Sequence, residues 1–526
     1  MEQPVASSSI TRRKFLVGTG SIVAAGALGP ALSRTKSASD PFTLGVASGD
    51  PLPDGVVLWS RLAPDPLNGG GMPSRDLPVQ WQVASDEGFR RVIKKGTAMA
   101  RSRWAHSVHV EVEGLEPSSW YWYRFKAGSE ISPVGRTKTA PKTTSSPDRF
   151  RFAFASCQQY EHGYYTAYRH MANEDLDLVC HLGDYIYEYG PDEYVAPGGN
   201  VRHHPAPEVM SLTDYRNRYA LYKSDPDLQS AHAAFPWAFT WDDHEVENDY
   251  ADEESENGDP DRRFLRRRAN AYRACWEHMP LRSSPTRGSD LRLYQRLRFG
   301  DLVEMSVLDT RQYRSDQACA RATGEFLGGG QLVDDCPAIF DGDRSMLGPR
   351  QERWVLDGLG RSKARWNVIA QQLLMAYLDE KPGPGVSFWT DGWDGYQPAR
   401  ARILGYLHGR GISNPVVIGG DIHSFWATDL KADFRNENSA TIATEFVGTS
   451  ITSAGVPQDV FESFLPDNPH IRFFDARLRG YVRCAIDQSR WRTDFQVVDN
   501  VRVRNSPLRT LASFEVEDGK PGAQAV

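Results

Sequence analysis

The sequence feature that most limits the fold of this chain is a set of four apolar runs that each end in side chains able to bind metals. The runs cover residues 149–156, 176–182, 233–241 and 415–418. In an α/β sheet, the loops at the carboxyl ends of the strands converge on one edge. A single Asp at a strand end is usually structural, but four such ends are hard to explain by packing alone. The pattern therefore predicts an α/β domain with one site at that edge.

The side chains that follow these runs indicate which metals the site could hold. They are Cys157, Asp184, Tyr187, Asp243, Asp421 and His423. Asp184 can bridge two cations, and the anionic donors Cys157 and Tyr187 suit Fe³⁺ better than Mg²⁺. Asp243 and Asp421 are hard oxygen donors that suit Ca²⁺, Mn²⁺ or Mg²⁺. We therefore expect one ferric ion beside one or more hard divalent ions.

This donor set favours the hydrolysis of phosphate esters. Two ions about 3.5–4 Å apart can polarise a phosphoryl oxygen and activate a water molecule for attack on phosphorus. A protonated group on the opposite side must assist the leaving alkoxide, and His244, next to Asp243, is the best candidate for this acid. The alternative role for His244 is to orient a neighbouring metal ligand.

Three motifs occur in the same order as in the purple-acid-type metallophosphoesterases and resemble them. They are GDYIY at 183–187, DDHE at 242–245 and GDIH at 420–423. The Gly-Asn-His-Glu that is usual in that family is here Asp-Asp-His-Glu, and the usual Gly-His-x-His is here Gly-Asp-Ile-His. Together with FASCQ at 154–158, these replacements resemble the alkaline phosphatase D (PhoD-type) branch. The resemblance covers nearly the whole chain and includes GVASGDP at 45–51 and LDTR at 308–311.

The resemblance implies a role for each candidate ligand. Cys157, Tyr187 and His423 would hold Fe³⁺, and Asp184 would bridge from it to Ca²⁺. The other two Asp residues of the set would bind this second metal, where other divalent ions are also possible. Members of this branch hydrolyse phosphate monoesters and diesters at alkaline pH, and some relatives are described as phospholipases D. The expected partner is a small phosphate ester or a phospholipid.

The pattern of apolar and polar residues along the chain predicts two structural domains. Residues 40–140 read as all-β and resemble an immunoglobulin or fibronectin type III sandwich. Apolar residues alternate at 108–113 and 121–125, and a Tyr spaced after Leu-Glu-Pro is typical of a tyrosine corner. Residues 149–490 are expected to form the catalytic domain, an α/β domain with a metallophosphoesterase-type β-sandwich core flanked by helices.

Helices and the C-terminal tail can also be predicted from local patterns. We expect helices at 164–173, 214–223, 262–279 and 348–359. The remaining residues, 491–526, are expected to be a tail with one strand at 494–500, after which polar, Pro-bearing residues fray.

The first 39 residues have the character of a secretory signal. Arg12 and Arg13 precede an apolar, Gly/Ala-rich stretch, which resembles the twin-arginine type of signal. This stretch is short for a spanning helix, so we expect cleavage and no transmembrane anchor. The protein would then pass through the twin-arginine export machinery and be periplasmic, cell-wall-associated or secreted. Because this route carries folded proteins, metals could be inserted before export.

Charge and cysteine content narrow the remaining possibilities. The formal net charge of −7 offers no electrostatic footprint for nucleic acid, so we expect no nucleic-acid-binding domain. Cys319 and Cys336 flank a Gly-rich loop and are the best disulfide candidates for an oxidising compartment.

Three further residues could contribute to the site. Asn248 could supply an oxygen to an additional Ca²⁺, or it could be a turn residue. Gln371 follows an apolar run at a place where other phosphoesterases have a His. Arg311 could bind phosphate with two hydrogen bonds, although a structural ion pair with Asp309 is the preferred interpretation.

Two other functions compete with a phosphomonoesterase and phosphodiesterase. A phospholipase D-like enzyme would be favoured by exposed aromatic residues around the site, although core packing is their commoner fate. The candidates are Trp389, Trp393, Phe425 and Trp426. A non-catalytic exported binding protein agrees less well with the complete ligand set. His203 and His204 lie in a Pro-rich loop and are expected at the surface.

Overall fold

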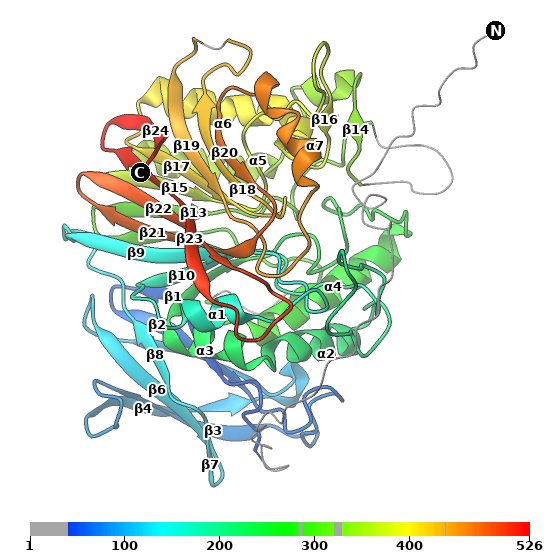
Figure 1. Cartoon of the computed structure of the whole chain (residues 1–526). Coiled ribbons are helices and arrows are strands. Elements are labelled where there is room, and N and C mark those ends of the chain that lie inside the picture. Colours follow the sequence, from blue (N-terminus) through cyan, green and yellow to red (C-terminus); the bar gives the residue numbers. More distant parts are fainter. Residues whose placement is uncertain (1–39, 283–287, 320–328, 437) are drawn as a thin grey trace.

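The computed structural model describes residues 40–282, 288–319, 329–436 and 438–526. Two β-sheets packed face to face form the centre of the molecule, with helices on both outer sides (Figure 1). The predicted mixed α/β class is therefore confirmed. The predicted signal, 1–39, lies outside the described residues.

The larger central sheet has ten strands in the described part of the chain. In spatial order they are β24 (Lys520–Ala525), β23 (Leu508–Glu517), β22 (Arg490–Val498), β21 (Arg479–Asp487), β9 (Arg149–Ala155), β10 (Leu178–Leu182), β11 (Pro236–Thr240), β1 (Val46–Leu52), β2 (Gly55–Arg61) and β5 (Ser107–Glu113). Strands β9, β10, β11 and β1 run parallel to one another. Their carboxyl ends therefore lie along one edge of the sheet.

Seven strands of the described residues form the smaller central sheet. They are β12 (Gln295–Phe299), β13 (Val303–Val307), β15 (Trp366–Ala370), β17 (Pro415–Gly419), β19 (Thr441–Val447), β18 (Phe425–Lys431) and β20 (Ile471–Asp475). Strands β13, β15, β17 and β19 are parallel. A parallel bridge between Ser156 and Ser450 joins the two sheets just beyond the carboxyl ends of β9 and β19.

Side-chain alternation in β9 shows how one short sequence serves two cores. Phe150, Phe152 and Phe154 point into the core between the two sheets. Ala153 and Ala155 point the other way, into the core beneath the helices. Successive side chains of a strand face opposite sides of its sheet, so a strand with both faces covered reads as a nearly continuous apolar run.

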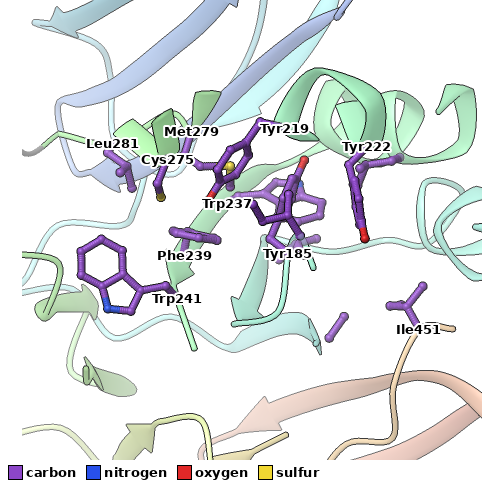
Figure 2. Packing of buried hydrophobic residues seen from close by; sticks show 14 of the residues in the cluster. Tyr185, Tyr219, Tyr222, Trp237, Phe239, Trp241, Cys275, Met279, Leu281 and Ile451 are labelled. Atoms are coloured by element: carbon purple, nitrogen blue, oxygen red, sulfur yellow. The ribbon is translucent and has the colours of Figure 1, made fainter. Parts of the chain in front are cut away.

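Helices cover the outer faces of the two sheets (Figure 1). On the larger sheet lie α1 (Thr166–Met171), α2 (Leu212–Lys223), α3 (Pro226–Ala234) and α4 (Asp261–His278). On the smaller sheet lie α5 (Gly348–Arg361), α6 (Gln397–Arg410) and α7 (Gln458–Glu462). The four predicted helices are confirmed as α1, α2, α4 and α5. Figure 2 shows aromatic side chains of β11 packed with those of α2.

The N-terminal strands form a second, smaller core. Strands β3 (Leu77–Ala84), β4 (Val92–Ala100), β6 (Trp120–Ala127), β7 (Glu130–Ile131) and β8 (Gly135–Lys138) make a separate sheet. It packs against β2 and β5. The Tyr121 hydroxyl accepts a hydrogen bond from the backbone N–H of Glu116 at 2.9 Å. Because β1 pairs with β11, the N-terminal strands also extend the central sheet. The domain limits 40–140 and 149–490 remain predictions.

The expectation that the C-terminal tail frays was wrong. Beyond β22, strands β23 and β24 complete the edge of the larger sheet. Phe514 and Val516 are buried in the core between the sheets, whereas Glu515 and Glu517 between and after them point away from it. This period-two pattern makes β23 half polar, which is why the segment resembles a tail when only its composition is considered.

A disulfide joins Cys319 and Cys336, as predicted. It lies near the small antiparallel sheet formed by β14 (Leu332–Val333) and β16 (Phe388–Trp389). Among the described residues, no helix combines the length and the apolar character that crossing a membrane requires.

Candidate metal centre

The six predicted ligands come together where the carboxyl ends of the parallel strands meet. Ligand atoms of Cys157, Asp184 and His423 all lie within 4.8 Å of one another. The same is true of two neighbouring groups, Asp184 with Asp243 and His244, and Asp242 with Asp243 and Asp421. The Tyr187 hydroxyl donates to Asp184 Oδ2 at 2.8 Å and lies 3.2 Å from His423 Nε2.

Four of these residues have left-handed backbone conformations. The φ angles are 59° at Cys157, 55° at Asp184, 63° at Asp421 and 54° at His423. Such a conformation costs a residue with a side chain about 1–3 kcal/mol, and strain of this kind gathers at functional sites. The loops after β9, β10 and β17 are therefore held in shapes that aim their side chains at a common point.

Backbone hydrogen bonds hold these loops against one another. The Glu245 carboxylate accepts from the N–H groups of Asp184 (3.1 Å), Tyr185 (2.5 Å) and Asp242 (2.8 Å). The N–H of Cys157 donates to the Gly183 carbonyl at 3.1 Å. Gly183 has φ 107°, and an added Cβ there would lie 2.4 Å from Asp242 Cβ. The loops after β10 and β11 thus require both Glu245 and a glycine at this contact.

The environment of His423 prepares its Nε2 to bind a cation. Its Nδ1 lies 2.8 Å from the Ala454 carbonyl, which only a protonated Nδ1 can satisfy. Burial, with a smaller contribution from Arg479, lowers the pKa of His423 to about 3. The ring is therefore neutral, with its free lone pair on Nε2 toward Tyr187.

The thiol of Cys157 needs a cation in order to ionise. Burial and the neighbouring Asp184 carboxylate raise the pKa of Cys157 well above its ordinary value. Burial and Asp184 likewise raise the pKa of the Tyr187 phenol. A bound metal ion reverses this balance, because coordination deprotonates a thiol.

Crowded carboxylates show that the site fits cations. Asp184 Oδ1 and Asp242 Oδ2 are buried without a hydrogen-bond donor. Burial and the repulsion of neighbouring carboxylates raise the pKa of Asp421 well above its ordinary value and that of Asp242 to about 6. Bound cations would satisfy the orphaned oxygens and remove the repulsion, so the donor set present fits the metals that its residue types predict.

Arg311 supplies positive charge to the carboxylate side of the site. Its guanidinium forms ion pairs with Asp242, Asp391 (2.8 Å) and Asp421 (3.2 Å). The preferred ion pair between Arg311 and Asp309 is absent from the described contacts. Asp309 instead accepts the backbone N–H of Arg311 at 3.0 Å. The reason is that the Arg311 side chain turns toward several carboxylates, whereas Asp309 closes a local turn.

The other two candidate residues make local contacts. The Asn248 amide oxygen accepts a hydrogen bond from the Tyr189 hydroxyl at 3.1 Å. The Gln371 oxygen accepts from the backbone N–H of Leu373 (2.9 Å) and from the Trp393 indole (3.1 Å). Gln371 therefore shapes the loop after β15.

Most of the residues considered for a surface role are buried. Trp393, Phe425 and Trp426 are fully buried in the cores, which is the commoner fate of such residues, so these three aromatic residues form no exposed rim. His204 is also buried, with Nδ1 2.9 Å from the Tyr189 carbonyl and Nε2 3.2 Å from the Tyr222 hydroxyl. His203 is exposed, as expected.

His244 lies beside the metal ligands with a carboxylate behind it. Its ring stacks on Tyr187 with centroids 4.2 Å apart, and Nδ1 lies 2.7 Å from Glu188 Oε2. Burial by itself lowers the pKa of His244, but Glu188, Asp243 and Asp184 together raise it well above its ordinary value. The imidazolium is therefore poised to donate a proton from the other ring nitrogen.

Some residues of the site were missed by the sequence analysis. Glu188 directly follows Tyr187, and that adjacency to a motif was the available signal. Asp391 pairs with Arg311 and Arg314, yet only its place just after β16 marks it. The Ser453 hydroxyl lies 2.7 Å from the Tyr187 oxygen, across 266 residues of sequence, and no local pattern indicates it.

An α/β core whose strand ends gather a thiol, a phenol, an imidazole and several carboxylates is suited to a hydrolase that uses metal ions. Residues 152–495 match the model of the PhoD-like phosphatase family, and residues 27–141 match that of its N-terminal domain. The chain belongs to the PhoD-like phosphatase family, as the sequence motifs predicted, and it is a hydrolase of phosphoric esters.

Individual relatives agree with this assignment. The chain is 49% identical to alkaline phosphatase D of Bacillus subtilis (strain 168), over 100% of this chain and 91% of that protein. A solved structure described as that of PhoD is 50% identical, with a TM-score of 0.89. It covers 95% of this chain and 93% of its own.

Proposed function

We propose that this protein is an exported, metal-dependent phosphoesterase that hydrolyses phosphate monoesters and diesters. The observation that carries the proposal is the meeting of Cys157, Tyr187 and His423 with the clustered Asp residues at the ends of parallel strands. Similarity to an alkaline phosphatase D supports the same chemistry.

The two kinds of donor side chain favour two different metal ions. Cys157, Tyr187 and His423 would hold Fe³⁺, because thiolate and phenolate favour a strongly Lewis-acidic ion. Asp184 would bridge to a Ca²⁺ or another hard divalent ion held by Asp243 and Asp421. When bound, the ions would supply Lewis-acid activation of the phosphoryl group and of water.

The residues around the metals would position the ester and manage its protons. His244 would donate its proton to the leaving alkoxide, and Glu188 would keep the ring oriented and charged. Arg311, whose guanidinium reaches Asp421, would orient the phosphate or the carboxylate beside it. Asn248, placed next to Glu188 by its own backbone N–H, is the proposed additional oxygen donor.

The proposal also covers the export of the protein and its domain organisation. The 39 N-terminal residues would direct the folded protein through the twin-arginine machinery to the periplasm, cell wall or medium. The all-β region 40–140 would be an immunoglobulin-like or fibronectin III-like domain, and 149–490 a metallophosphoesterase-type core. Support comes from the packing of the separate N-terminal sheet against β2 and β5 and from the Tyr121 contact.

A phospholipase D-like activity is the second candidate. A cavity of about 270 Å³ lies beside Glu188 and Tyr189, close to the proposed proton donor. Five carboxylates and two arginines line it, an excess of negative charge that suits a positively charged alcohol. The burial of Trp393, Phe425 and Trp426 argues the other way, because an interfacial enzyme needs exposed apolar residues.

Metal analysis and turnover test the proposal together. The purified protein should contain iron and show a visible phenolate-to-iron band, which Tyr187→Phe should remove. Asp184→Ala should lower turnover at least about 10²-fold, the scale of removing one charge-stabilising group. Asp343→Ala, which removes an exposed carboxylate, is the matched control. Zinc as the only metal would overturn the ferric assignment, and full turnover in Asp184→Ala would overturn the site.

Glu188→Gln tests the proton donor. Without the Glu188 charge, the pKa of His244 falls, so the alkaline limb of the pH–rate profile should move to lower pH. Glu193→Gln, which changes a carboxylate that accepts the backbone N–H of Gly190 at 2.9 Å, should leave that limb in place. Rates on a monoester, a diester and a phosphatidylcholine dispersion would then separate the two candidate functions.

A further inference from the structure

A second group of metal-binding side chains lies outside the proposed centre. Ligand atoms of Glu161, Asp192 and His203 all lie within 4.8 Å of one another. Glu161 lies in the segment after β9, whereas Asp192 and His203 belong to the Gly- and Pro-rich segment between β10 and α2. The group thus joins two loops that are distant in sequence.

Glu161 has a buried carboxylate oxygen that accepts no hydrogen bond. Its side chain is 0% exposed. Oε1 accepts hydrogen bonds from the backbone N–H groups of His204 (3.0 Å) and Asp192 (3.3 Å), whereas Oε2 is buried without a hydrogen-bond donor, with His204 Nδ1 3.7 Å away. A buried acceptor left unsatisfied is costly, and a cation at this group would satisfy it.

The other two side chains are already spaced as ligands of one ion. Asp192 Oδ1 and His203 Nδ1 are 3.2 Å apart. Two ligand atoms about 2.0–2.1 Å from one tetrahedral Zn²⁺ are separated by about 3.3 Å. Asn200 Nδ2 donates to the same Asp192 oxygen at 3.0 Å and holds the carboxylate in place.

We propose that Glu161, Asp192 and His203 bind a peripheral divalent ion, with water completing the coordination. One imidazole and two carboxylates suit Zn²⁺ or a similar transition-metal ion, because Ca²⁺ and Mg²⁺ are bound by oxygen donors. The neighbouring His204 is not a ligand, because Tyr189 and Tyr222 occupy both of its ring nitrogens.

The ion would hold the Gly- and Pro-rich segment against the rim of the metal centre. Next to Glu161, His162 Nε2 lies 3.0 Å from the Tyr194 carbonyl, and Nδ1 accepts the N–H of Ala454 at 3.0 Å. Ala454 in turn accepts the His423 Nδ1 proton. The Tyr194 ring lies 6.3 Å from that of Tyr187. An ion at Glu161 would therefore stabilise the segment that carries Tyr194 beside the proposed ligands.

Zinc binding to the purified holoenzyme and its variants tests the site. His203→Ala removes an exposed ligand, and Asp192→Asn keeps the shape and the left-handed backbone that Asn tolerates. His408→Ala, which removes an exposed histidine of α6, is the matched control. Equilibrium dialysis against micromolar Zn²⁺ would count zinc, iron and calcium per chain, and displacement at the main centre would be common to all four proteins.

The expected result is one more zinc ion in the wild type and in His408→Ala than in His203→Ala. Asp192→Asn should bind that ion about tenfold more weakly or worse. Zinc should also raise the thermal unfolding midpoint of the wild type more than that of His203→Ala. Equal zinc content and equal zinc affinity in wild type and His203→Ala would refute the site.

Discussion

Glu245 offers the sharpest test of how the site is held together. Its carboxylate makes no contact with substrate in the proposed mechanism, yet it accepts three backbone N–H groups from two loops. Oε1 accepts the N–H of Tyr185, and Oε2 accepts the N–H groups of both Asp184 and Asp242. Glu245→Gln keeps the size of this side chain but replaces one acceptor oxygen with an NH₂ donor.

The geometry sets the size of the effect. The best placement of the amide puts its oxygen at the position shared by Asp184 and Asp242, and its NH₂ then faces the N–H of Tyr185. One hydrogen bond to a carboxyl oxygen is lost, and one buried donor is left unpaired. Each change is worth about 1–3 kcal/mol, so the free energy of unfolding should fall by about 2–6 kcal/mol.

The same variant should lose metal as well as stability. Guanidinium unfolding at matched pH would measure the free energy, and metal analysis would measure site occupancy. Glu253→Gln makes the same chemical change on an exposed side chain and should stay within about 0.5 kcal/mol of the wild type. If Glu245→Gln kept wild-type stability and metal content, the argument that this carboxylate holds the loops would be wrong.

Two further predictions concern backbone space and buried charge. Gly183→Ala should lower stability by about 2–6 kcal/mol and abolish turnover, because its Cβ would lie 2.5 Å from the Asp242 nitrogen at φ 107°. Gly405→Ala, where the Cβ meets open space, is the control. Equal unfolding curves for Gly183→Ala and Gly405→Ala would contradict the prediction. Burial lowers the pKa of Lys223 to about 7. Between pH 7 and 10 the folded state lacks a proton that the unfolded chain keeps, so wild-type stability should rise relative to Lys223→Met by up to about 1.4 kcal/mol per pH unit. Parallel denaturation profiles of these two proteins over that range would refute the assignment.

The sequence alone was sufficient for the type of fold and for the main ligands. Apolar runs of strand length and amphipathic helical stretches are local patterns, and they located β9, β10, β11 and β17 correctly. Ligand-type residues directly after those runs predicted a common edge, because parallel strands bring their carboxyl ends together. The family followed from the same motifs.

Edge strands and single contacts were harder to predict. The C-terminal segment was expected to fray because a half-exposed strand carries as many polar as apolar residues. The side chain of Arg311 was assigned to the nearest carboxylate in sequence, Asp309, whereas in the folded chain it reaches Asp242 and Asp421. Sequence distance is a poor guide to partners for a long, fully buried side chain.

What the sequence determined by itself is the chemical identity of the donors, because Cys157, Tyr187 and Asp184 stand in local motifs whose meaning does not depend on distant residues. Only the tertiary structure decided how those donors are aimed. The hydrogen bonds that Glu245 accepts from Asp184 and Tyr185 and the contact of Ser453 with Tyr187 join segments far apart in the chain. Such contacts form when strands pair and sheets pack, and no local pattern of residues encodes their geometry.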